Sequence, residues 1–512
     1  MSGDINWTAL IVFILFFALV TVLGFVASRW KAGDLSQLHE WGLGGRRFGT
    51  WITWFLVGGD FYTAYTVIAV PALVFASGAY GFFALPYTII VYPIVFTIMP
   101  RLWAVSKKHH YLTSADFVHG RYGNGVLAFA VAFTGILATM PYIALQLVGM
   151  QAVIGGLGIG GPGLQGELPL IIAFVILALY TYSSGLRAPA MIAFVKDIMI
   201  YIVVIAAVAV IPIKLGGYAH VFQAASDAFA AKGAGGITLK SAQMVPFASL
   251  ALGSAMAAFM YPHTMTGVLS SSSGDVVRKN AMLLPAYTIL LGLIALLGYM
   301  GIAAGVSVKT NTQVVPALFQ AIFPDWFVGF SYAAIAIGAL VPAAIMSIGA
   351  ANLFTRNIWK PLMGNSMKPE SEAATAKMVS LVVKVGALAF IILDQAKFAI
   401  DLQLLGGVWI IQTFPAIVFG LYRTRFNSWA LFIGWATGMI VGTWMAYSTG
   451  TIKPVYAVAL GDSTYSVYIA ILAGLLNIVI AVVLTQLFKV LGGSKDSDQT
   501  TAADYELASE KA

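Results

Sequence analysis

The 512-residue chain contains no cysteine, and only 9% of its residues are charged. The absence of cysteine excludes disulfides, thiolate nucleophiles and cysteine-ligated metal centres. The scarcity of charge excludes an ordinary water-soluble enzyme, because soluble domains carry about 25% charged residues. Hydrophobic residues make up 60% of the chain and recur in long uncharged runs from one end to the other. The sequence therefore predicts an all-α polytopic membrane protein.

Histidine is scarce, and nucleotide-binding motifs are absent. The six histidines fall in predicted loops or at the ends of apolar runs, at positions 39, 109, 110, 119, 220 and 263. A haem or copper centre inside the membrane needs imidazole or thiolate ligands on facing helices, so a cytochrome is disfavoured and no cofactor is expected. The chain has no GxxxxGK[ST] motif, and its polar connections are too short for a nucleotide-binding domain. ATP-driven transport by this chain alone is therefore excluded.

Thirteen runs are long and apolar enough to cross a bilayer, because a hydrocarbon core of about 30 Å takes about 20 helical residues. They lie near residues 7–29, 48–74, 79–100, 125–155, 167–184, 189–213, 244–262, 280–305, 328–355, 378–394, 398–421, 427–447 and 464–491. We expect them to form one transmembrane domain over residues 1–492. Residues 493–512 are polar and low in apolar content, which predicts a disordered cytoplasmic tail.

The basic residues indicate an orientation. With the amino terminus outside, 20 of the 28 Lys and Arg residues lie in cytoplasmic loops and six lie outside. The positive-inside rule therefore predicts an outside amino terminus and an inside carboxy terminus. The net charge of +8 is explained by this topology, so no nucleic-acid partner is expected. The bilayer is the expected environment, and no obligatory protein partner is predicted.

The second run contains Gly58-Gly59-Asp60 at its middle. Two glycines beside a carboxylate suit a discontinuous helix whose freed carbonyls face a hydrated cavity. The alternative is close helix packing through small residues. We favour the broken helix, because Asp60 needs a wet or paired environment.

Several short segments resemble signatures of the sodium/solute symporter family. In chain order they are GGRRFG at 44–49, TSADF at 113–117, RYG at 121–123, SGLRA at 184–188, PH at 262–263, MS at 346–347 and NL at 352–353. Each is weak alone, but their order and spacing over about residues 30–360 are similar to the family. Tyr261-Pro262-His263 and the serines at 270–273 most resemble the bacterial monocarboxylate permease branch. His263 itself is expected to cap the inner end of the seventh run.

The resemblance implies the leucine-transporter fold, with two inverted five-helix repeats. These would span about residues 48–213 and 244–421, with peripheral helices at 7–29, 427–447 and 464–491. A second broken helix is expected at Gly253-Ser254-Ala255. The resemblance also implies a multi-pass protein of the bacterial cytoplasmic (inner) membrane.

The family's cation ligands fall on four positions of this chain. They are the carbonyls of Gly59, Tyr62 and Ala344 and the hydroxyl of Ser347. A sodium ion is possible there, but the next ligand position is Ile348, whose side chain offers no oxygen. An aspartate expected in the sixth run falls on Ala193.

Lys196-Asp197 stands one turn after Ala193, within an apolar run. An intramembrane lysine is costly and is a functional candidate, since its ammonium can replace a cation and release a proton. The alternative is a structural pair, or a lysine that reaches toward the membrane surface. Asp60, Lys196 and Asp197 are thus candidate proton carriers, and no other metal site is expected.

Substrate contacts are expected on runs 2, 4, 7 and 11, which line the cavity in this fold. A small carboxylate needs hydroxyls, amides and half-helix amino termini in an apolar pocket. The candidates are Thr63, Tyr65, Tyr142, Gln146, Ser254, Phe259, Trp409 and Gln412.

The predicted function is secondary active symport of a small organic acid, such as lactate or pyruvate, by alternating access. The coupling ion is H+ or Na+, with H+ favoured because of Ile348, Ala193 and Lys196. No covalent chemistry is expected, so the chain is predicted not to be an enzyme. One alternative is a sodium-coupled symporter of an amino acid, acetate or pantothenate. The alternative from another class is a transporter-like membrane sensor.

Overall fold

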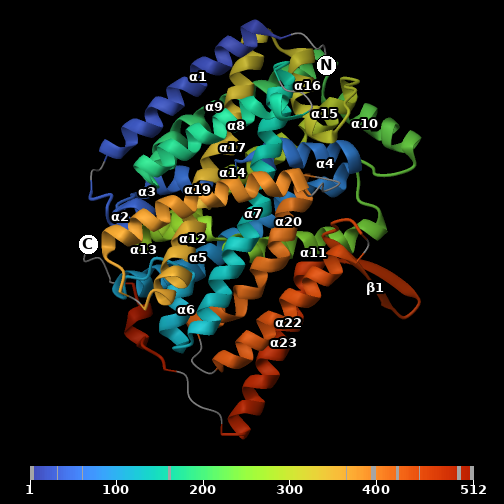
Figure 1. Cartoon of the computed structure of the whole chain (residues 1–512). Helices are drawn as coiled ribbons and strands as arrows, with labels where there is room; N and C mark the ends of the chain where they lie inside the picture. Colours follow the sequence, from blue (N-terminus) through green and yellow to red (C-terminus); the bar gives the residue numbers. More distant parts are fainter. Residues whose placement is uncertain are drawn as a thin grey trace.

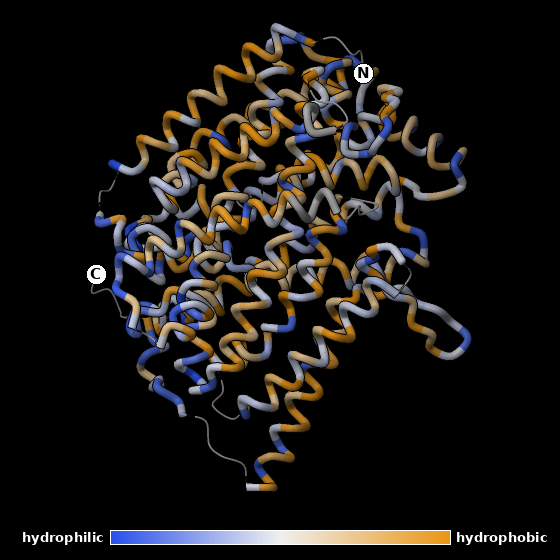
Figure 2. Tube along the Cα trace, in the orientation of Figure 1, coloured by the Kyte–Doolittle hydropathy of each residue, from blue (hydrophilic) through white to orange (hydrophobic). Residues whose placement is uncertain are grey.

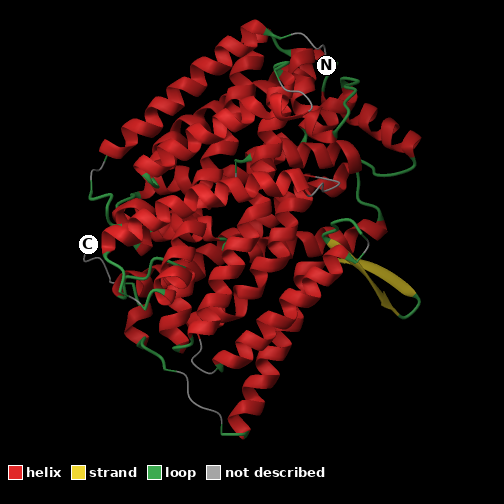
Figure 3. Cartoon of the chain, viewed as in Figure 1, coloured by secondary structure: helices red, strands yellow, loops and turns green. Residues whose placement is uncertain are grey.

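The computed structural model of the chain is almost entirely helical, with one small two-stranded hairpin (Figure 3). It describes residues 5–30, 33–59, 62–159, 163–364, 366–393, 399–422, 426–448, 450–492 and 497–507.

The elements of the first half extend to α10 (Figure 1). They are α1 (Trp7–Val26), η1 (Ala27–Arg29), α2 (Leu38–Leu43), η2 (Gly44–Arg46), α3 (Thr50–Thr53), η3 (Trp54–Gly58), η5 (Tyr65–Ala69), α4 (Val70–Ser77), η6 (Gly78–Phe83), α5 (Ala84–Lys108), α6 (Ser114–Tyr122), α7 (Gly125–Gly156), α8 (Gly163–Ser184), α9 (Arg187–Lys214) and α10 (Tyr218–Lys232).

The second half begins with α11. Its elements are α11 (Ser241–Ala258), α12 (Pro262–Leu269), α13 (Gly274–Leu283), α14 (Pro285–Ala295), α15 (Leu297–Ala303), η7 (Asn311–Gln313), α16 (Val314–Ile322), α17 (Asp325–Phe354), η8 (Thr355–Trp359), α18 (Lys360–Leu362), α19 (Pro369–Leu393), α20 (Ala399–Ile410), η9 (Ile411–Thr413), η10 (Pro415–Phe419), α21 (Gly420–Tyr422), α22 (Ser428–Tyr447), β1 (Val455–Leu460), β2 (Ser463–Tyr468), α23 (Ile469–Val490) and η11 (Ala502–Tyr505).

Ten helices of the described chain are long and apolar enough to cross a membrane, or eleven if the bent pair α11 and α12 counts as one span. Two of the thirteen expected spans, 48–74 and 79–100, share the helical stretch Tyr65–Lys108. The expected span at 378–394 corresponds to α19, which is not among the ten. The prediction of a multi-span helical membrane protein is confirmed, and the division into two repeats stays a prediction.

The helices form a bundle around α17, and every residue in the most apolar stretch of α17 is buried. In α1 and α23 only 22% and 28% of the most apolar stretch is buried, and Figure 2 shows long hydrophobic stretches along both. Large exposed apolar faces on long helices are what a lipid environment requires, because the hydrocarbon solvates them without cost. α17 is thus the central helix, and α1 and α23 are peripheral.

The first broken helix lies where the glycine pair predicted it. η3 ends at Gly58, and helical structure resumes at Ala64 and η5. The backbone N–H of Ala64 donates to Gln146 Oε1 over 3.1 Å, and that of Tyr65 donates to Thr63 Oγ1 over 3.0 Å. These bonds satisfy amide groups that a helix start leaves free. The broken helix is confirmed, although Asp60 lies outside the described residues.

The second broken helix lies about one turn later than predicted. α11 continues through Gly253-Ser254-Ala255 and ends at Ala258, and α12 begins at Pro262 after a bend of 49°. The residue before a proline is disfavoured in the helical region, and Tyr261 is extended with φ −62° and ψ 141°. Gly253 serves packing instead, because a Cβ there would collide with the ring of Tyr468. The proline, not the glycine, sets the break.

Three polar regions contain more structure than the sequence suggested. The connection at 214–243 includes α10, and the hairpin β1–β2 precedes α23 and projects from the bundle (Figure 1). Residues 497–507 were expected to be disordered, but the structure places them against α5 and α6, where Arg121 pairs with Asp498 at 2.6 Å. The segment has few apolar residues to bury, and ion pairs with the bundle hold it in place instead.

Candidate functional site

The centre of the candidate site is the Lys196–Asp197 pair on α9. Both side chains are completely buried, and Lys196 Nζ lies 3.0 Å from Asp197 Oδ1. The ammonium also donates to the carbonyl of Gly59 and, over 3.3 Å, to the carbonyl of Tyr62. Both carbonyls lie at the break in the first discontinuous helix, where the Gly59 carbonyl also accepts the backbone N–H of Tyr62 over 3.2 Å. The three N–H donors of an ammonium thus face two carbonyls and one carboxylate.

This arrangement brings together four residues that the sequence assigned to cation coupling. The carbonyls of Gly59 and Tyr62 were expected to face a cation, and in the structure that cation is the lysine ammonium. The fit is tight, because a Cβ on Gly59 would lie 2.8 Å from Lys196 Nζ. A buried charge is tolerated when it is paired and hydrogen-bonded, and both conditions hold here.

Tyrosines enclose the buried pair. The hydroxyl of Tyr287, on α14, donates to Asp197 Oδ2 over 2.8 Å. The Tyr62 hydroxyl donates to the Tyr287 carbonyl over 3.3 Å, and the two rings are 4.5 Å apart. Tyr201 packs edge-on against both rings. Each carboxylate oxygen of Asp197 therefore faces a defined partner, and α14 from the second half of the chain holds one of them.

The α17 positions predicted as cation ligands are buried but do not join this cluster. Within the described part of the chain, the Ser347 hydroxyl donates to the Ala344 carbonyl over 2.8 Å, so these two positions bond to each other. On α17 it is Gly338 that faces the Tyr62 carbonyl, because a Cβ on Gly338 would lie 3.6 Å from that oxygen. Ile348 and Ala193 are buried and supply no side-chain oxygen.

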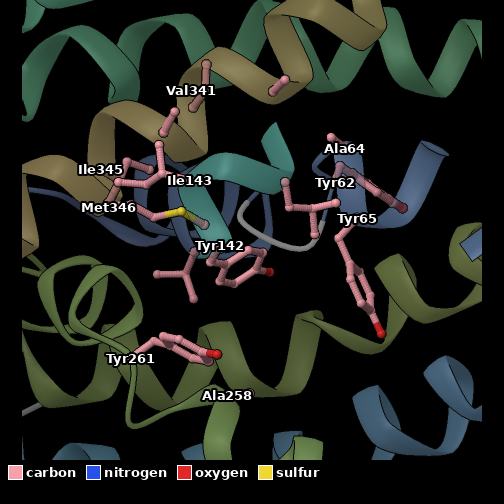
Figure 4. Packing of buried hydrophobic residues seen from close by; sticks show 14 of the residues in the cluster. Tyr62, Ala64, Tyr65, Tyr142, Ile143, Ala258, Tyr261, Val341, Ile345 and Met346 are labelled. Carbon is pink, nitrogen blue, oxygen red and sulfur yellow. The ribbon is translucent and has the colours of Figure 1, made fainter. Parts of the chain in front are cut away.

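A small internal cavity of about 10 Å³ lies at the second helix break. That volume is about enough for one water molecule. Figure 4 shows Tyr142 of α7 and Tyr261 on the same side of α17, and their rings are 5.3 Å apart. The lining residues are Tyr87, Tyr142, Ala258, Tyr261, His263, Thr264 and Gln403. Polar and aromatic groups from α5, α7, α12 and α20 thus converge at the first turn of α12.

The sequence identified only Tyr142 among these lining residues. His263 was expected as a cap at the end of a span, but it is 3% exposed in the first turn of α12 and lies 5.3 Å from the Tyr142 ring. Gln403 is 2% exposed, and its Oε1 has no hydrogen-bond partner among the described residues. Tyr261-Pro262 is the sequence feature that could have identified His263, because a proline there places the helix break beside it.

Two other predicted substrate residues shape the first helix break. The Thr63 hydroxyl and the Gln146 amide cap the returning helix, as described above. Gln146 Nε2 also donates to the Tyr142 carbonyl one turn earlier on α7 over 3.3 Å, so the bond from Ala64 to Gln146 joins this break to the helix that lines the cavity. Tyr65 is buried, and its hydroxyl has no hydrogen-bond partner among the described residues.

The remaining predicted substrate residues lie apart from the cavity lining. Ser254 and Phe259 are buried on or just after α11, and Phe259 packs against Phe414. Trp409 Nε1 donates to Thr443 Oγ1 on α22 over 2.9 Å, and Gln412 Oε1 accepts from Asn477 on α23 over 3.1 Å. Trp409 and Gln412 therefore use their polar groups to hold the peripheral helices.

Comparison with known proteins agrees with this architecture. A solved structure of a Na+-coupled sialic acid symporter, substrate-bound and outward-open, superposes with a TM-score of 0.75 at 15% identity, covering 96% of this chain and 99% of that one. At this identity the match shows the fold alone. The leucine-transporter-like fold expected from the sequence is thus confirmed.

Sequence relatives cover nearly the whole chain. A monocarboxylate transport permease protein of Rhizobium johnstonii is 63% identical, over 95% of this chain and 98% of its own. An uncharacterized symporter of Bacillus subtilis, YodF, is 35% identical over 88% of this chain and 90% of its own. The model of the sodium:solute symporter family matches residues 41–442, a range that includes both helix breaks and the Lys196–Asp197 pair. The chain is therefore a membrane transporter that belongs to the sodium:solute symporter family.

Proposed function

We propose that this transporter imports a small monocarboxylate together with a proton, and that Lys196 is the residue that binds and releases the proton. The observation that carries the proposal is the lysine ammonium at the carbonyls of Gly59 and Tyr62. The relative named as a monocarboxylate transport permease supports the substrate class. The polar lining of the cavity at the second helix break supports a site for a small acid.

The chemistry of coupling follows from the ligands of the ammonium. Sodium needs several oxygen ligands to replace its water. The side chains of Ile348 and Ala193 supply no oxygen. A protonated Lys196 needs only three acceptors, which the site provides. When Lys196 gives its proton to water on the inner side, the neutral amine can donate only two hydrogen bonds and loses its charge attraction to Asp197. At least one of the three acceptors then loses its hydrogen bond, which weakens the attachment of Lys196 to the first broken helix.

Substrate and proton would be coupled through the two helix breaks. Gln146 bonds both to the returning first helix at Ala64 and to the Tyr142 carbonyl beside the cavity. A carboxylate in the cavity would meet the amino-terminal end of α12, whose dipole favours anions. Substrate binding would thus favour the same conformation as the protonated lysine, and the coupling must be reciprocal. The cavity must also enlarge, because a three-carbon acid exceeds about 10 Å³.

We further propose that the protein lies in the bacterial cytoplasmic membrane with its amino terminus outside. The support is the uneven distribution of Lys and Arg between the two sets of loops. Residues 497–507 then lie on the cytoplasmic side, together with Arg46 of η2, Arg121 of α6 and Arg356 of η8.

The test is uptake of labelled L-lactate and pyruvate into proteoliposomes with the pH and sodium gradients imposed separately. We expect an inside-alkaline gradient without sodium to drive accumulation, and a sodium gradient at equal pH to drive none. Lys196→Met should abolish the pH-driven accumulation. Lys384→Met is the matched control, because Lys384 is also a buried lysine but bonds within its own helix to the Ser380 carbonyl over 3.3 Å.

The alternative that this experiment separates is sodium coupling through the carbonyls of Gly59, Tyr62 and Ala344 and the hydroxyl of Ser347. Accumulation that needs sodium and ignores the pH gradient would establish it and reject our proposal. Uptake of acetate, an amino acid or pantothenate in the same vesicles, with no uptake of lactate or pyruvate, would reject the substrate assignment alone.

A further inference from the structure

The segment 497–507 docks on the end of the bundle formed by α5, α6 and α13. Its backbone N–H at Gln499 donates to the Gly120 carbonyl over 2.9 Å. In Figure 1 it is the short red segment beside α6. The segment is therefore bound to the bundle although it begins beyond a peripheral helix.

Charged and aromatic contacts hold the segment. Arg121 of α6 is 6% exposed and donates to Asp498 Oδ2 over 2.6 Å and to Thr500 Oγ1 over 2.8 Å. Asp504 is 3% exposed and pairs with Lys108 and, at 2.8 Å, with His109. Charge-assisted hydrogen bonds of buried groups are the strong ones.

Tyr505 contributes the aromatic contact between the two anchor points. It is buried and lies under two guanidinium groups, with Arg121 Cζ 5.3 Å and Arg101 Cζ 5.5 Å from its ring centroid. Leu507 covers Gly274, the first residue of α13. One short segment thus contacts α5, α6 and α13 at the same time.

The helices that the segment connects belong to two packing groups. α5 packs along α13 and α14, whereas α6 is joined to α7 through Gly123 and Asn124, and α7 packs on α17, α19 and α20. Direct contact between α5 and α6 is slight. Alternating access requires groups of helices to move relative to one another. Asp504 and Leu507 attach to the first group, and Asp498 and Thr500 attach to the second.

We propose that the segment 497–507 is an autoinhibitory latch. While docked, it holds the α5–α13 group and the α6–α7 group in the arrangement seen in this structure. Transport requires the contacts of Arg121 or of Asp504 to break in each cycle. Release of the segment therefore lowers the barrier to the conformational change, and a covalent lock on it stops transport. The proposal does not depend on which ion or acid is carried.

The first test locks the latch. The chain has no cysteine, so Gly274→Cys with Leu507→Cys introduces the only possible disulfide. We expect oxidation to cross-link the pair, to lower uptake at least tenfold, and to be reversed by a reductant, while each single variant ignores the oxidant. Full transport by the cross-linked protein would overturn the proposal. Failure of the cross-link to form would also overturn it, because Leu507 would then not be docked on α13.

The second test releases the latch and does not need a known substrate. In a Leu507→Cys background, docking places the thiol against Gly274 of α13 and slows its labelling by a soluble maleimide. We expect Arg121→Glu to raise the labelling rate about tenfold, as for the loss of a charge-assisted bond. The charge swap Arg121→Glu with Asp498→Arg should restore slow labelling. Lys240→Glu, an exposed site outside the docking surface, is the control. Equal rates in all variants would disprove docking.

Discussion

Tyr287 of α14 donates a hydrogen bond to Asp197 of α9 over 2.8 Å, across a sequence distance of 90 residues. The bond joins the second half of the chain to the buried pair of the first half. It also leaves Asp197 with one oxygen toward the lysine and one toward the tyrosine. The position of the Lys196 ammonium at the broken helix therefore depends on a residue outside that helix.

Replacing Tyr287 by Phe should shift the pH dependence of transport. The variant keeps the ring but removes the donor that stabilises ionised Asp197, which weakens the Lys196–Asp197 pair. A hydrogen bond to a charged group contributes about 1.5–3 kcal/mol, and about 1.4 kcal/mol corresponds to one pH unit. We expect half-maximal proton-driven uptake to move at least one unit toward acid. Tyr332→Phe is the control, since its hydroxyl bonds to Pro316. An unchanged profile for Tyr287→Phe would mean that this bond has no part in coupling.

Replacing Gly59 by Ala should abolish transport without unfolding the protein. A Cβ there would lie 2.8 Å from Lys196 Nζ and 3.1 Å from Asp197 Oδ2, so the ammonium must leave the carbonyls. We expect at least a hundredfold loss of the initial uptake rate, with a cooperative melting transition in detergent at a lowered temperature because the buried pair loses partners. Gly155→Ala on α7 meets nothing within 4 Å and should transport normally. Retained transport by Gly59→Ala would exclude close contact of Lys196 with the broken helix.

Replacing His263 by Gln should weaken substrate binding more than it slows transport. His263 lines the cavity at the second break, whereas the lysine pair lies at the first. We expect KM for the acid to rise at least tenfold with a smaller change in maximal rate and an unchanged pH midpoint. His220→Gln, in the exposed helix α10, is the matched control. A fall in maximal rate at constant KM would assign His263 to the conformational step instead.

Two arginines on one carboxylate should differ widely in their contribution to stability. Arg187 is completely buried and pairs with Glu40, whereas Arg47 binds the other oxygen of Glu40 at 2.6 Å with its side chain 47% exposed. Removing one partner of a buried pair costs about 3–5 kcal/mol, and an exposed pair contributes about 0–1 kcal/mol. We expect Arg187→Met to lower the melting temperature strongly and Arg47→Gln to change it little. Equal shifts would show that Glu40 is hydrated in solution.

The docking of residues 497–507 should persist at mildly acidic pH. Burial alone would raise the pKa of Asp504, but hydrogen bonds from Lys108, His109 and Thr501 lower it below the ordinary value of 3.8. A lowered pKa stabilises docking above about pH 3.8, and this contribution is lost only as the pH falls through the lower, docked value. Because maleimide reacts with the thiolate, the labelling rate of Leu507→Cys is compared at each pH with that of Leu507→Cys combined with Arg121→Glu. We expect the same ratio of the two rates at pH 7 and pH 5. A ratio that approaches one at pH 5 would show that Asp504 is not held as the structure has it.

The sequence predicted the features that local chemistry determines. Gly58-Gly59 and the lysine in an apolar run are anomalies of single segments, so the broken helix and the coupling candidate could be found from them. Gly253 was misread because the sequence does not distinguish a glycine that makes room for the Tyr468 ring from a glycine that unwinds a helix. Tertiary packing alone separates the two cases.

Contacts over long sequence distances could not be predicted in this way. Nothing near Trp409 or Gln412 indicates that their polar groups bind Thr443 and Asn477 of the peripheral helices. The polar segment 497–507 has the composition of a disordered chain, and its order comes from Arg121 and Lys108, almost 400 residues earlier. The cavity at His263 likewise depends on four helices that meet only in the folded protein.

Lys196 is attached to α9 by its own backbone, so the positive group at the broken helix cannot diffuse away and need not be recaptured from solution. Its local concentration is the same in dilute and in concentrated salt. Under the proposed proton coupling, a carrier built in this way needs no alkali metal, and the gradients of the hydrogen ion and of the acid together set its direction.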